Sequence, residues 1–425
     1  MVSMQNQRRN MDPPSSVHPL EKLRNRAVFI ETYGCRYNFG DTAKLVEILK
    51  KIGCTMVDLP DKADAVIINT CTVVGTTERK MLRRLAQLRD RDLYVTGCMT
   101  VVQREAIFGV STPTIIMPEL IHSQFQSVGT VEPSNTGIVQ IARGCQGNCT
   151  YCITRLARGP LRSYREEEIL GQVQAFIRAG AAEIQLTAQD VSAWGMDTGQ
   201  RVSELLTLLG RQPGPHMIRV GMMNPATVKM QTGELVDAFA SDHIYKFLHI
   251  PVQSGSDRIL RMMGRGYSRA EFEEIADAFR DRYPGITIAT DVIVGFPGES
   301  DEDFFATVDL VRKIRPGKVN VTRYSRRPYT QAANGNEVPE TIKKDRSRIL
   351  NAVAGEVYAS INTPALGSIV PFTVTETLKE GSVMARTPEY TGLVLDEVLP
   401  VGAKGLARLK KDRRYFFTGE RIDSL

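Results

Sequence analysis

The chain has 425 residues, of which 42% are hydrophobic and 24% charged, as in ordinary soluble globular proteins. No apolar run approaches the roughly 20 residues that cross a bilayer, and seven cysteines without a secretory signal argue against a disulfide scaffold. The length suggests two or three domains, and the net charge of +6 weakly favours an anionic partner such as RNA.

Residues 1–26 are polar and contain Pro13, Pro14 and several arginines. They lack the apolar stretch of a secretory signal, so we expect a disordered basic lead-in. A mitochondrial transit peptide is the alternative, but Asp12 and Glu21 argue against it. Free cysteines fit a reducing cytosol, and we therefore expect a cytoplasmic protein.

The first globular part, residues 27–130, alternates short β-branched runs with helical patterns. This alternation predicts an open parallel α/β sheet domain. The predicted strands are residues 27–33, 65–70, 93–96 and 114–117. Residues 127–136, which contain Pro133, Ser134 and Asn135, are predicted to be a linker.

A second alternating series covers residues 137–360 and predicts a partial (β/α)6 barrel, whose chemistry lies at the carboxyl ends of the strands. Its predicted strands are residues 138–142, 183–187, 217–222, 245–250, 286–294 and 318–324. From residue 365 to 425 the pattern changes to short strands with turn signals, at 369–375, 383–386, 392–398 and 407–409. This last part is predicted to be a small all-β barrel.

Three cysteines directly after the first strand of the predicted barrel form a C-x3-C-x2-C motif: Cys145, Cys149 and Cys152. Three thiolates in one short loop suit an iron–sulfur cluster or zinc. A [4Fe–4S] cluster has four irons, so three ligands would leave one iron open to a small molecule. The motif therefore indicates reactivity rather than electron transfer alone.

A second set of cysteines follows three predicted strands of the first domain: Cys35, Cys71 and Cys98. The carboxyl ends of parallel strands share one edge of the sheet, so these residues can converge. They could be buried structural thiols or a zinc site, although no histidine stands near them in the sequence. A second three-cysteine cluster is the sharper hypothesis, while Cys54, at the opposite edge, is predicted to be a packing residue.

With both sets placed, residues 27–422 resemble the radical S-adenosylmethionine (SAM) methylthiotransferases. Besides the cysteines, the matching segments are residues 32–38, 69–73, 97–99, 249–256 and 291–299. Within the family, residues 149–164 are similar to the branch that acts on threonylcarbamoyladenosine in tRNA. One departure is Tyr329, where the family segment Arg-Pro-Gly-Thr-x-Ala has glycine.

The resemblance implies two [4Fe–4S] clusters, one on each cysteine set, and SAM bound at the open iron of the first. It implies a radical reaction that replaces the hydrogen at C2 of adenine by a methylthio group. The implied partners are tRNA, a flavodoxin- or ferredoxin-like electron donor and a source of sulfur, with no membrane.

Other candidate residues are placed less directly. Gln189 and Asp190 follow the second barrel strand, where the superfamily commonly binds the methionine moiety of SAM, although a polar loop is the alternative. Gln253 and Asp291 hold similar positions, and His249 is predicted to be a hydrogen-bonded core histidine.

In the C-terminal barrel a basic cluster stands beside Tyr415, Phe416 and Phe417, and we predict that it binds RNA phosphates. Its members are Lys404, Arg408, Lys410, Lys411, Arg413 and Arg414. The aromatic residues are predicted to pack in the core of the barrel. This segment resembles the TRAM domain that grips tRNA in these enzymes.

Three alternatives stay open at this point. The substrate could be isopentenyladenosine in tRNA or a side chain of a ribosomal protein. A different class of function, a metal-stabilised RNA-binding protein without catalysis, is also compatible with the cysteines and the basic cluster.

Overall fold

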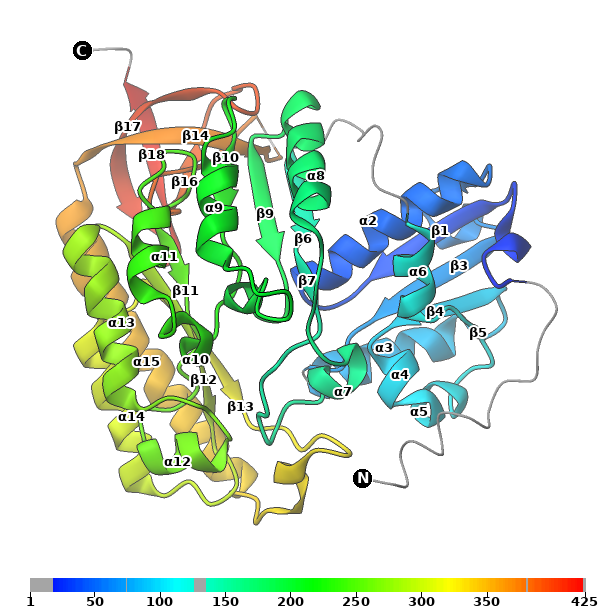
Figure 1. Cartoon of the computed structure of the whole chain (residues 1–425), viewed down its shortest axis with the longest axis horizontal. Coiled ribbons are helices and arrows are strands. Elements are labelled where there is room, and N and C mark those ends of the chain that lie inside the picture. Colours follow the sequence, from blue (N-terminus) through cyan, green and yellow to red (C-terminus); the bar gives the residue numbers. More distant parts are fainter. Residues whose placement is uncertain (1–17, 74, 126–134, 380, 423–425) are drawn as a thin grey trace. The chain divides into compact units, whose positions relative to one another are not determined.

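The computed structural model describes residues 18–73, 75–125, 135–379 and 381–422 (Figure 1). The chain divides into two compact units, Met1–Gln126 and Ser127–Leu425, and each is described by itself. None of the helices in the described ranges combines the length and the apolar character that a membrane crossing requires. The predicted linker lies almost wholly outside the described residues.

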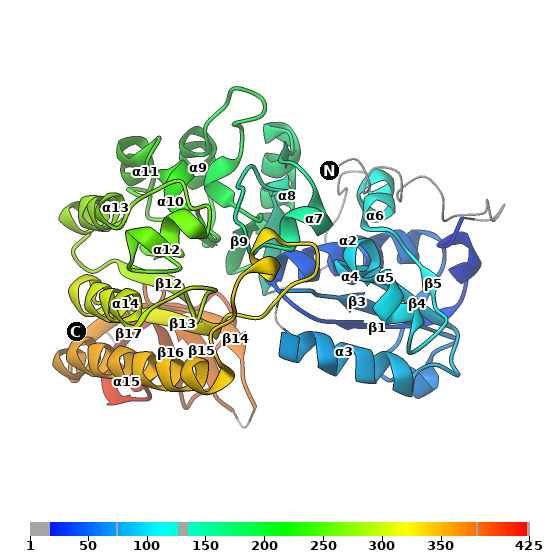
Figure 2. The same ribbon diagram turned by 90° about the horizontal axis from the view of Figure 1, so that it is seen from below.

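The first unit is built on a five-stranded parallel sheet, as predicted. Its order is β2 (Thr55–Met56), β1 (Ala27–Thr32), β3 (Ala65–Thr70), β4 (Leu93–Gly97) and β5 (Thr114–Ile115). Helices cover both faces (Figure 2) because the central strands are apolar on both sides. On one face lie α2 (Arg36–Lys51) and α6 (Pro118–Gln124), and on the other α3 (Gly75–Gln87), with α4 (Met99–Val102) and α5 (Arg104–Phe108).

The predicted disordered lead-in is wrong from residue 18 onward, and residues 1–17 lie outside the described residues. Leu20 and Leu23 are almost fully buried, and a short 3-10 helix, η1 (Glu21–Leu23), carries them into the core beside α2. The Cys54 thiol donates a hydrogen bond to the Leu23 carbonyl oxygen at 2.9 Å. Cys54 is therefore a packing residue, as predicted, and it anchors the lead-in.

The second unit contains the six predicted β/α strands in two parallel sheets of three. One has the order β10 (Met217–Arg219), β9 (Glu183–Thr187), β6 (Thr136–Gln140), and the other β11 (Phe247–His249), β12 (Thr287–Val294), β13 (Lys318–Arg323). A parallel bridge between Ile218 and Ile244 joins the two sheets. The result is an open barrel with β6 and β13 as its outer strands, which confirms the predicted fold class.

Helices on the outside of this open barrel bury its apolar outer face. They are α8 (Glu166–Arg178), α9 (Val202–Gly210), α11 (Thr232–Ala238), α13 (Arg269–Arg282), α14 (Asp301–Ile314) and α15 (Glu340–Ala365). Three shorter helices, α7 (Thr154–Arg158), α10 (Pro225–Val228) and α12 (Asp257–Met262), and the ribbon of β7 (Ala142–Arg143) with β8 (Arg162–Ser163), follow the connections.

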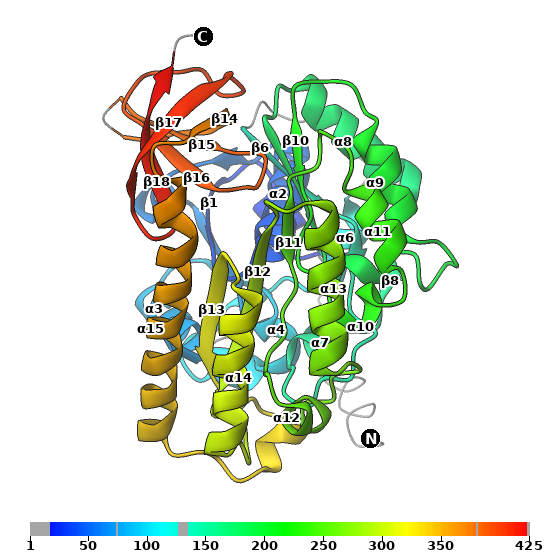
Figure 3. The same cartoon turned by 90° about the vertical axis from the view of Figure 1, so that its left-hand side faces the viewer.

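After α15 the chain forms a closed five-stranded barrel (Figure 3). The strands run in the order β14 (Ile369–Thr377), β15 (Val383–Arg386), β16 (Gly392–Leu395), β18 (Phe416–Ile422) and β17 (Lys404–Asp412). The sequence pattern missed β18 and shortened β17, because basic residues interrupt the apolar alternation there. Phe417 packs in the core as predicted, but Tyr415 is exposed.

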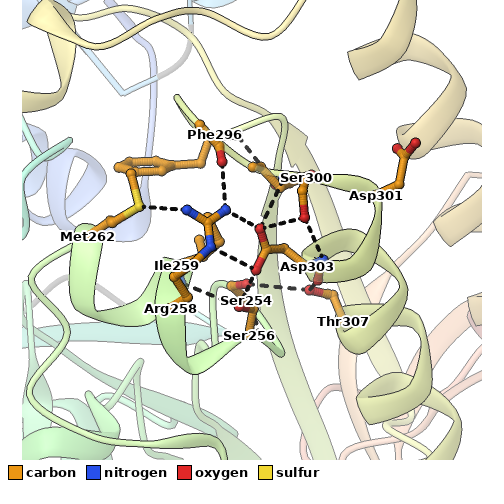
Figure 4. A network of polar contacts seen from close by, with 12 residues as sticks. Ser254, Ser256, Arg258, Ile259, Met262, Phe296, Ser300, Asp301, Asp303 and Thr307 are labelled. Atoms are coloured by element: carbon orange, nitrogen blue, oxygen red, sulfur yellow. Dashed lines mark hydrogen bonds and ion pairs between the residues drawn. The ribbon is translucent and has the colours of Figure 1, made fainter.

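A polar network holds the loop after β11 against α14 (Figure 4). Arg258 binds the Asp303 carboxylate through two nitrogens, and Ser256 Oγ donates to Asp303 Oδ1 at 2.6 Å. Burial acts to raise the pKa of Asp303, but these donors outweigh it and hold the pKa well below its usual value. The carboxylate thus fixes the Ser254–Ser256 turn, whose Gly255 N–H donates to Thr307 Oγ1 at 2.8 Å.

We predict that Asp303→Asn lowers the free energy of unfolding by about 1–3 kcal/mol at pH 7, because charge-assisted hydrogen bonds are lost. The folded pKa lies below the unfolded value of about 3.9, so the contribution is full above that value and fades as pH falls through the folded pKa. Thermal unfolding followed by circular dichroism should show a larger loss at pH 7 than at pH 3.

The exposed Asp309 on the same helix provides the control, and Asp309→Asn should leave the transition nearly unchanged at both pH values. Equal losses in the two variants, or a loss for Asp303→Asn that does not depend on pH, would contradict the assignment.

Candidate active site

The Cys145 loop is held at the carboxyl end of β6 by a tight backbone approach. Gly144 has a φ of 77°, and a Cβ atom at this position would lie 1.9 Å from the Pro160 carbonyl oxygen. Its N–H donates to Gln189 Oε1 at 2.7 Å. Gln189, one of the predicted SAM residues, therefore holds the Cys145 loop in place through its amide oxygen.

The three thiols of this loop are close enough to influence one another's charge. Burial raises the pKa of Cys145 to about 12, and the neighbouring Asp190, Cys149 and Cys152 contribute to this rise. Burial also raises the pKa of Cys152, with Cys149 adding to the effect. Without a metal these two thiols are therefore neutral at pH 7, and metal binding must displace their protons.

The donor set fits a cluster better than a single ion. A structural zinc ion normally takes four protein ligands, whereas a [4Fe–4S] cluster binds each thiolate at a different iron. Three thiols of one loop without a fourth protein ligand suit a cluster that keeps one iron open.

Arg265 is a site residue that sequence reasoning missed. Its guanidinium donates to Cys149 Sγ at 3.1 Å, to Asn224 Oδ1 at 2.9 Å and to Tyr267 Oη at 2.9 Å. Arg265 lies 116 residues from Cys149 in the sequence, so no local spacing signals the contact. It places a positive charge and a hydrogen-bond donor on a metal-binding sulfur.

Asp190 supports this arrangement from within the protein. The Asp190 carboxylate is buried and accepts hydrogen bonds from Ser192 Oγ at 2.7 Å, Thr227 Oγ1 at 2.9 Å and the Asn224 N–H at 3.1 Å. Both of its oxygens are thus engaged by protein donors. In the structure Asp190 therefore holds Asn224 in position, and Asn224 in turn holds Arg265.

Gln253 and Asp291 lie in neighbouring segments of the barrel, joined by a hydrogen bond from the Gln253 N–H to the Asp291 carbonyl oxygen at 2.8 Å. Gln253 has a φ of 70°, unusual for a residue with a side chain, and its buried Oε1 has no partner in the described structure. A buried acceptor without a protein partner, beside a strained backbone, favours a ligand-binding role for Gln253.

Asp291 faces the barrel interior, where it binds His249 Nε2 at 3.0 Å and Asn320 Nδ2 at 2.6 Å. Burial acts to raise the pKa of Asp291, but these two hydrogen bonds outweigh it and lower the pKa. The carboxylate therefore stays ionised, and His249 is hydrogen-bonded as predicted.

The second cysteine set gathers at one sheet edge of the first unit. Cys35 precedes α2, Cys71 follows β3 and Cys98 precedes α4. Burial raises the pKa of Cys71 to about 11, and the nearby Cys98 and Cys35 contribute to this rise, so the three thiols are neighbours. Gly34, with a φ of 107°, lets the first loop approach, since a Cβ there would lie 2.6 Å from the Cys71 Cβ.

The predicted RNA-binding residues are spread over β17 and its turn, and all except the half-buried Arg408 are exposed. Lys410 forms an ion pair with Glu420 at 2.6 Å, and the Arg414 guanidinium stacks near the Tyr358 and Tyr415 rings. Lys404, Lys411 and Arg413 form no side-chain ion pair within the described ranges. The cations of these three residues are therefore available to an anionic ligand.

We predict that Arg265→Gln lowers the reduction potential of the iron–sulfur cluster reconstituted on the Cys145 loop. Hydrogen bonds and positive charge at a cluster sulfur favour the reduced, more negative state, and this variant removes both. A redox titration followed by electron paramagnetic resonance would measure the shift, with iron content as a check on loading.

Arg261→Gln is the matched control, because Arg261 is exposed on α12 and forms no hydrogen bond with a cysteine side chain among the described residues. Arg265→Lys, which keeps the charge, should lie between the wild type and Arg265→Gln. An unchanged potential in a fully loaded Arg265→Gln protein would refute the assignment.

Family models match both units of the chain. Residues 27–117 match the model described as Uncharacterized protein family UPF0004, and residues 139–311 match the Radical SAM superfamily. A Pyrococcus horikoshii protein named probable threonylcarbamoyladenosine tRNA methylthiotransferase is 39% identical, over 93% of this chain and 99% of its own. A Paenarthrobacter aurescens protein named tRNA-2-methylthio-N(6)-dimethylallyladenosine synthase is 32% identical, over 88% of this chain and 80% of its own.

Among solved structures, the radical SAM methyltransferase TsrM from Kitasatospora setae has a similar fold. The TM-score is 0.53 at 13% identity, over 73% of this chain and 77% of that chain. At this identity the likeness concerns the fold alone. The two family models and the near full-length relatives carry the assignment, and they show that the chain belongs to the radical SAM methylthiotransferase family.

Proposed function

We propose that this chain is a tRNA (N6-L-threonylcarbamoyladenosine-C2)-methylthiotransferase, which inserts a methylthio group at C2 of the modified adenosine 3′ of the anticodon. The observation that carries this proposal is the near full-length similarity to relatives named for that nucleoside, at 35–39% identity in four of them. The Xenopus laevis protein named threonylcarbamoyladenosine tRNA methylthiotransferase adds support at 32% identity over 76% of this chain.

Membership of the family implies a [4Fe–4S] cluster and SAM, and we assign that cluster to Cys145, Cys149 and Cys152. When bound, the cluster supplies the electron that cleaves SAM and starts radical chemistry. The protein around it orients the reactants and excludes water. Arg265 fixes the Cys149 sulfur, and Gln189 fixes the backbone that carries Cys145.

We assign SAM contacts to Gln253, whose Oε1 is free to accept a hydrogen bond, and to the amide nitrogen of the half-buried Gln189. Asp190 and Asp291 are already engaged by protein donors, so we give them a positioning role toward SAM. The second cluster is proposed on Cys35, Cys71 and Cys98, where it would carry the sulfur that is transferred.

The tRNA is proposed to bind the exposed basic residues of the C-terminal barrel, Lys411 and Arg413 above all. A register shift between Leu409 and Lys411 interrupts the pairing of β17 with β18, which resumes with Lys411 opposite Thr418. A bulge re-aims the side chains that follow it, which suits contacts to a phosphate backbone. The electron donor, the sulfur source and a cytoplasmic location remain predictions.

Mass spectrometry of tRNA nucleosides from cells lacking this protein would test the function. We expect methylthio-threonylcarbamoyladenosine to disappear and threonylcarbamoyladenosine to accumulate, and both should return to normal with the wild-type gene. An unchanged amount of methylthio-threonylcarbamoyladenosine, in cells with no redundant enzyme, would contradict the proposal. Loss of the methylthio-isopentenyl nucleoside instead would move the chain to the other tRNA branch.

Replacing one cysteine of each set should separate the two clusters. The wild type should hold about eight irons per chain after anaerobic reconstitution, and Cys71→Ala and Cys145→Ala about four each. Cys71→Ala should still cleave SAM while failing to methylthiolate tRNA, whereas Cys145→Ala should do neither. Full iron content in Cys71→Ala would remove the second cluster from the proposal, and Cys54→Ala serves as the non-ligand control.

A double variant, Lys411→Ala with Arg413→Ala, should weaken tRNA binding without affecting SAM cleavage. Each lost phosphate contact lowers the slope of log affinity against log salt by roughly 0.7–0.9. Filter binding between low and high salt would measure the change. Lys379→Ala, on the turn between β14 and β15, is the matched control, and an equal loss per charge in it would assign the effect to general charge.

A further inference from the structure

The inner face of the open barrel carries two cations that the proposed reaction has not used. Side chains alternate along a strand, and Ile218 and Val319 point outward into the core beneath the helices. Their neighbours Arg219, on β10, and Lys318, on β13, therefore face the interior. Lys318 remains solvent-accessible there, which leaves its ammonium group available to a ligand.

The C-terminal barrel adds a third cation to the same place. Tyr390, in the turn after β15, packs against Tyr245 and Phe247 at the amino ends of the barrel strands. The Arg386 guanidinium lies 4.6 Å from the Tyr390 ring centroid, and that of Arg219 lies 5.4 Å from it. The aromatic rings thus hold two guanidinium groups close together on the floor of the barrel.

None of the three cations forms an ion pair in the described part of the chain. Glu183 accepts from Tyr390 Oη at 2.9 Å and from Gln185 Nε2 at 2.5 Å, and Asp291 is taken by His249 and Asn320. The buried Arg386 Nε has no hydrogen-bond partner. Burial lowers the pKa of Lys318, and repulsion from Arg219 and Arg386 lowers it further, so the three charges are mutual neighbours.

We propose that Arg219, Lys318 and Arg386 form a carboxylate-binding site that reads the threonyl carboxylate of the substrate base. This inference rests on the proposed function, since threonylcarbamoyladenosine carries that carboxylate on N6 and dimethylallyladenosine has none. Guanidinium groups bind carboxylates in matched pairs of hydrogen bonds, and an unfilled site rejects a substrate that lacks the charge.

The position of the site suits this group better than other anions. Cys145 follows the carboxyl end of β6, whereas Lys318 begins β13 and Tyr390 binds the first residue of β9. C2 and N6 point in different directions from the adenine ring, so a base with C2 toward the cysteine loop can turn its N6 group toward the barrel floor. The carboxylate of SAM belongs at the cysteine loop, and backbone phosphates belong outside the barrel.

The test compares two anticodon stem-loop RNAs that differ only in charge: one carries threonylcarbamoyladenosine and the other its neutral methyl ester. The wild type should prefer the free acid in kcat/KM by at least about 10-fold, as expected for charged hydrogen bonds. Lys318→Gln and Arg219→Gln should each lose most of that preference, chiefly through the free acid. Lys344→Gln, an exposed lysine on α15, should keep it.

Several outcomes would overturn the inference. One is that both variants keep the wild-type preference, and another is that the wild type shows no preference at all. A third is that the variants bind SAM more weakly but keep the preference. A fourth is that the variants lose affinity equally for both RNAs, which would indicate phosphate contacts. A wild type that acts only on isopentenyladenosine RNA would instead refute the proposed function itself. SAM cleavage without RNA should be the same in all variants, which also checks that they fold.

Discussion

The structure depends on holding three thiols fixed in a loop with no regular secondary structure. A half-buried loop of this kind is held by a chain of polar contacts: Asp190 positions Asn224, Asn224 binds Arg265, and Arg265 binds the Cys149 sulfur. The members come from separate strand–helix connections that meet at the carboxyl ends of the parallel strands. The open barrel is thus the frame that brings these distant connections within hydrogen-bond distance of one sulfur loop.

The first unit also holds three cysteines in position, but with a different fold. Its three cysteines stand at the ends of adjacent parallel strands, so the strand spacing itself sets how far apart their loops lie. Close backbone packing then sets the distance between two of these loops, because Gly34 brings its loop against Cys71. Two unrelated sheets therefore reach similar donor sets, and both use the edge where successive connections converge.

Much of this could be predicted from the sequence, for a physical reason. Buried parallel strands are continuous apolar runs, so β3 coincides with its predicted limits, and cysteines at strand ends are visible without coordinates. Contacts between distant residues carry no such signal. Arg265 reads as one more basic residue after α12, and Leu20 and Leu23 stand in a polar segment whose burial depends on the Cys54 loop. Arg219 and Lys318 face inward only because of strand register.

Tyr390 gives the C-terminal barrel a second role. Its hydroxyl bonds to Glu183 and its ring covers Tyr245 and Phe247, so the C-terminal barrel also closes the bottom of the open barrel. A chain cut after α15 would leave these aromatic residues facing water and Glu183 without this donor. The two barrels are for this reason poor candidates for exchange as independent domains. A change of C-terminal domain during evolution would have to preserve or replace the aromatic contacts that it makes with its neighbour.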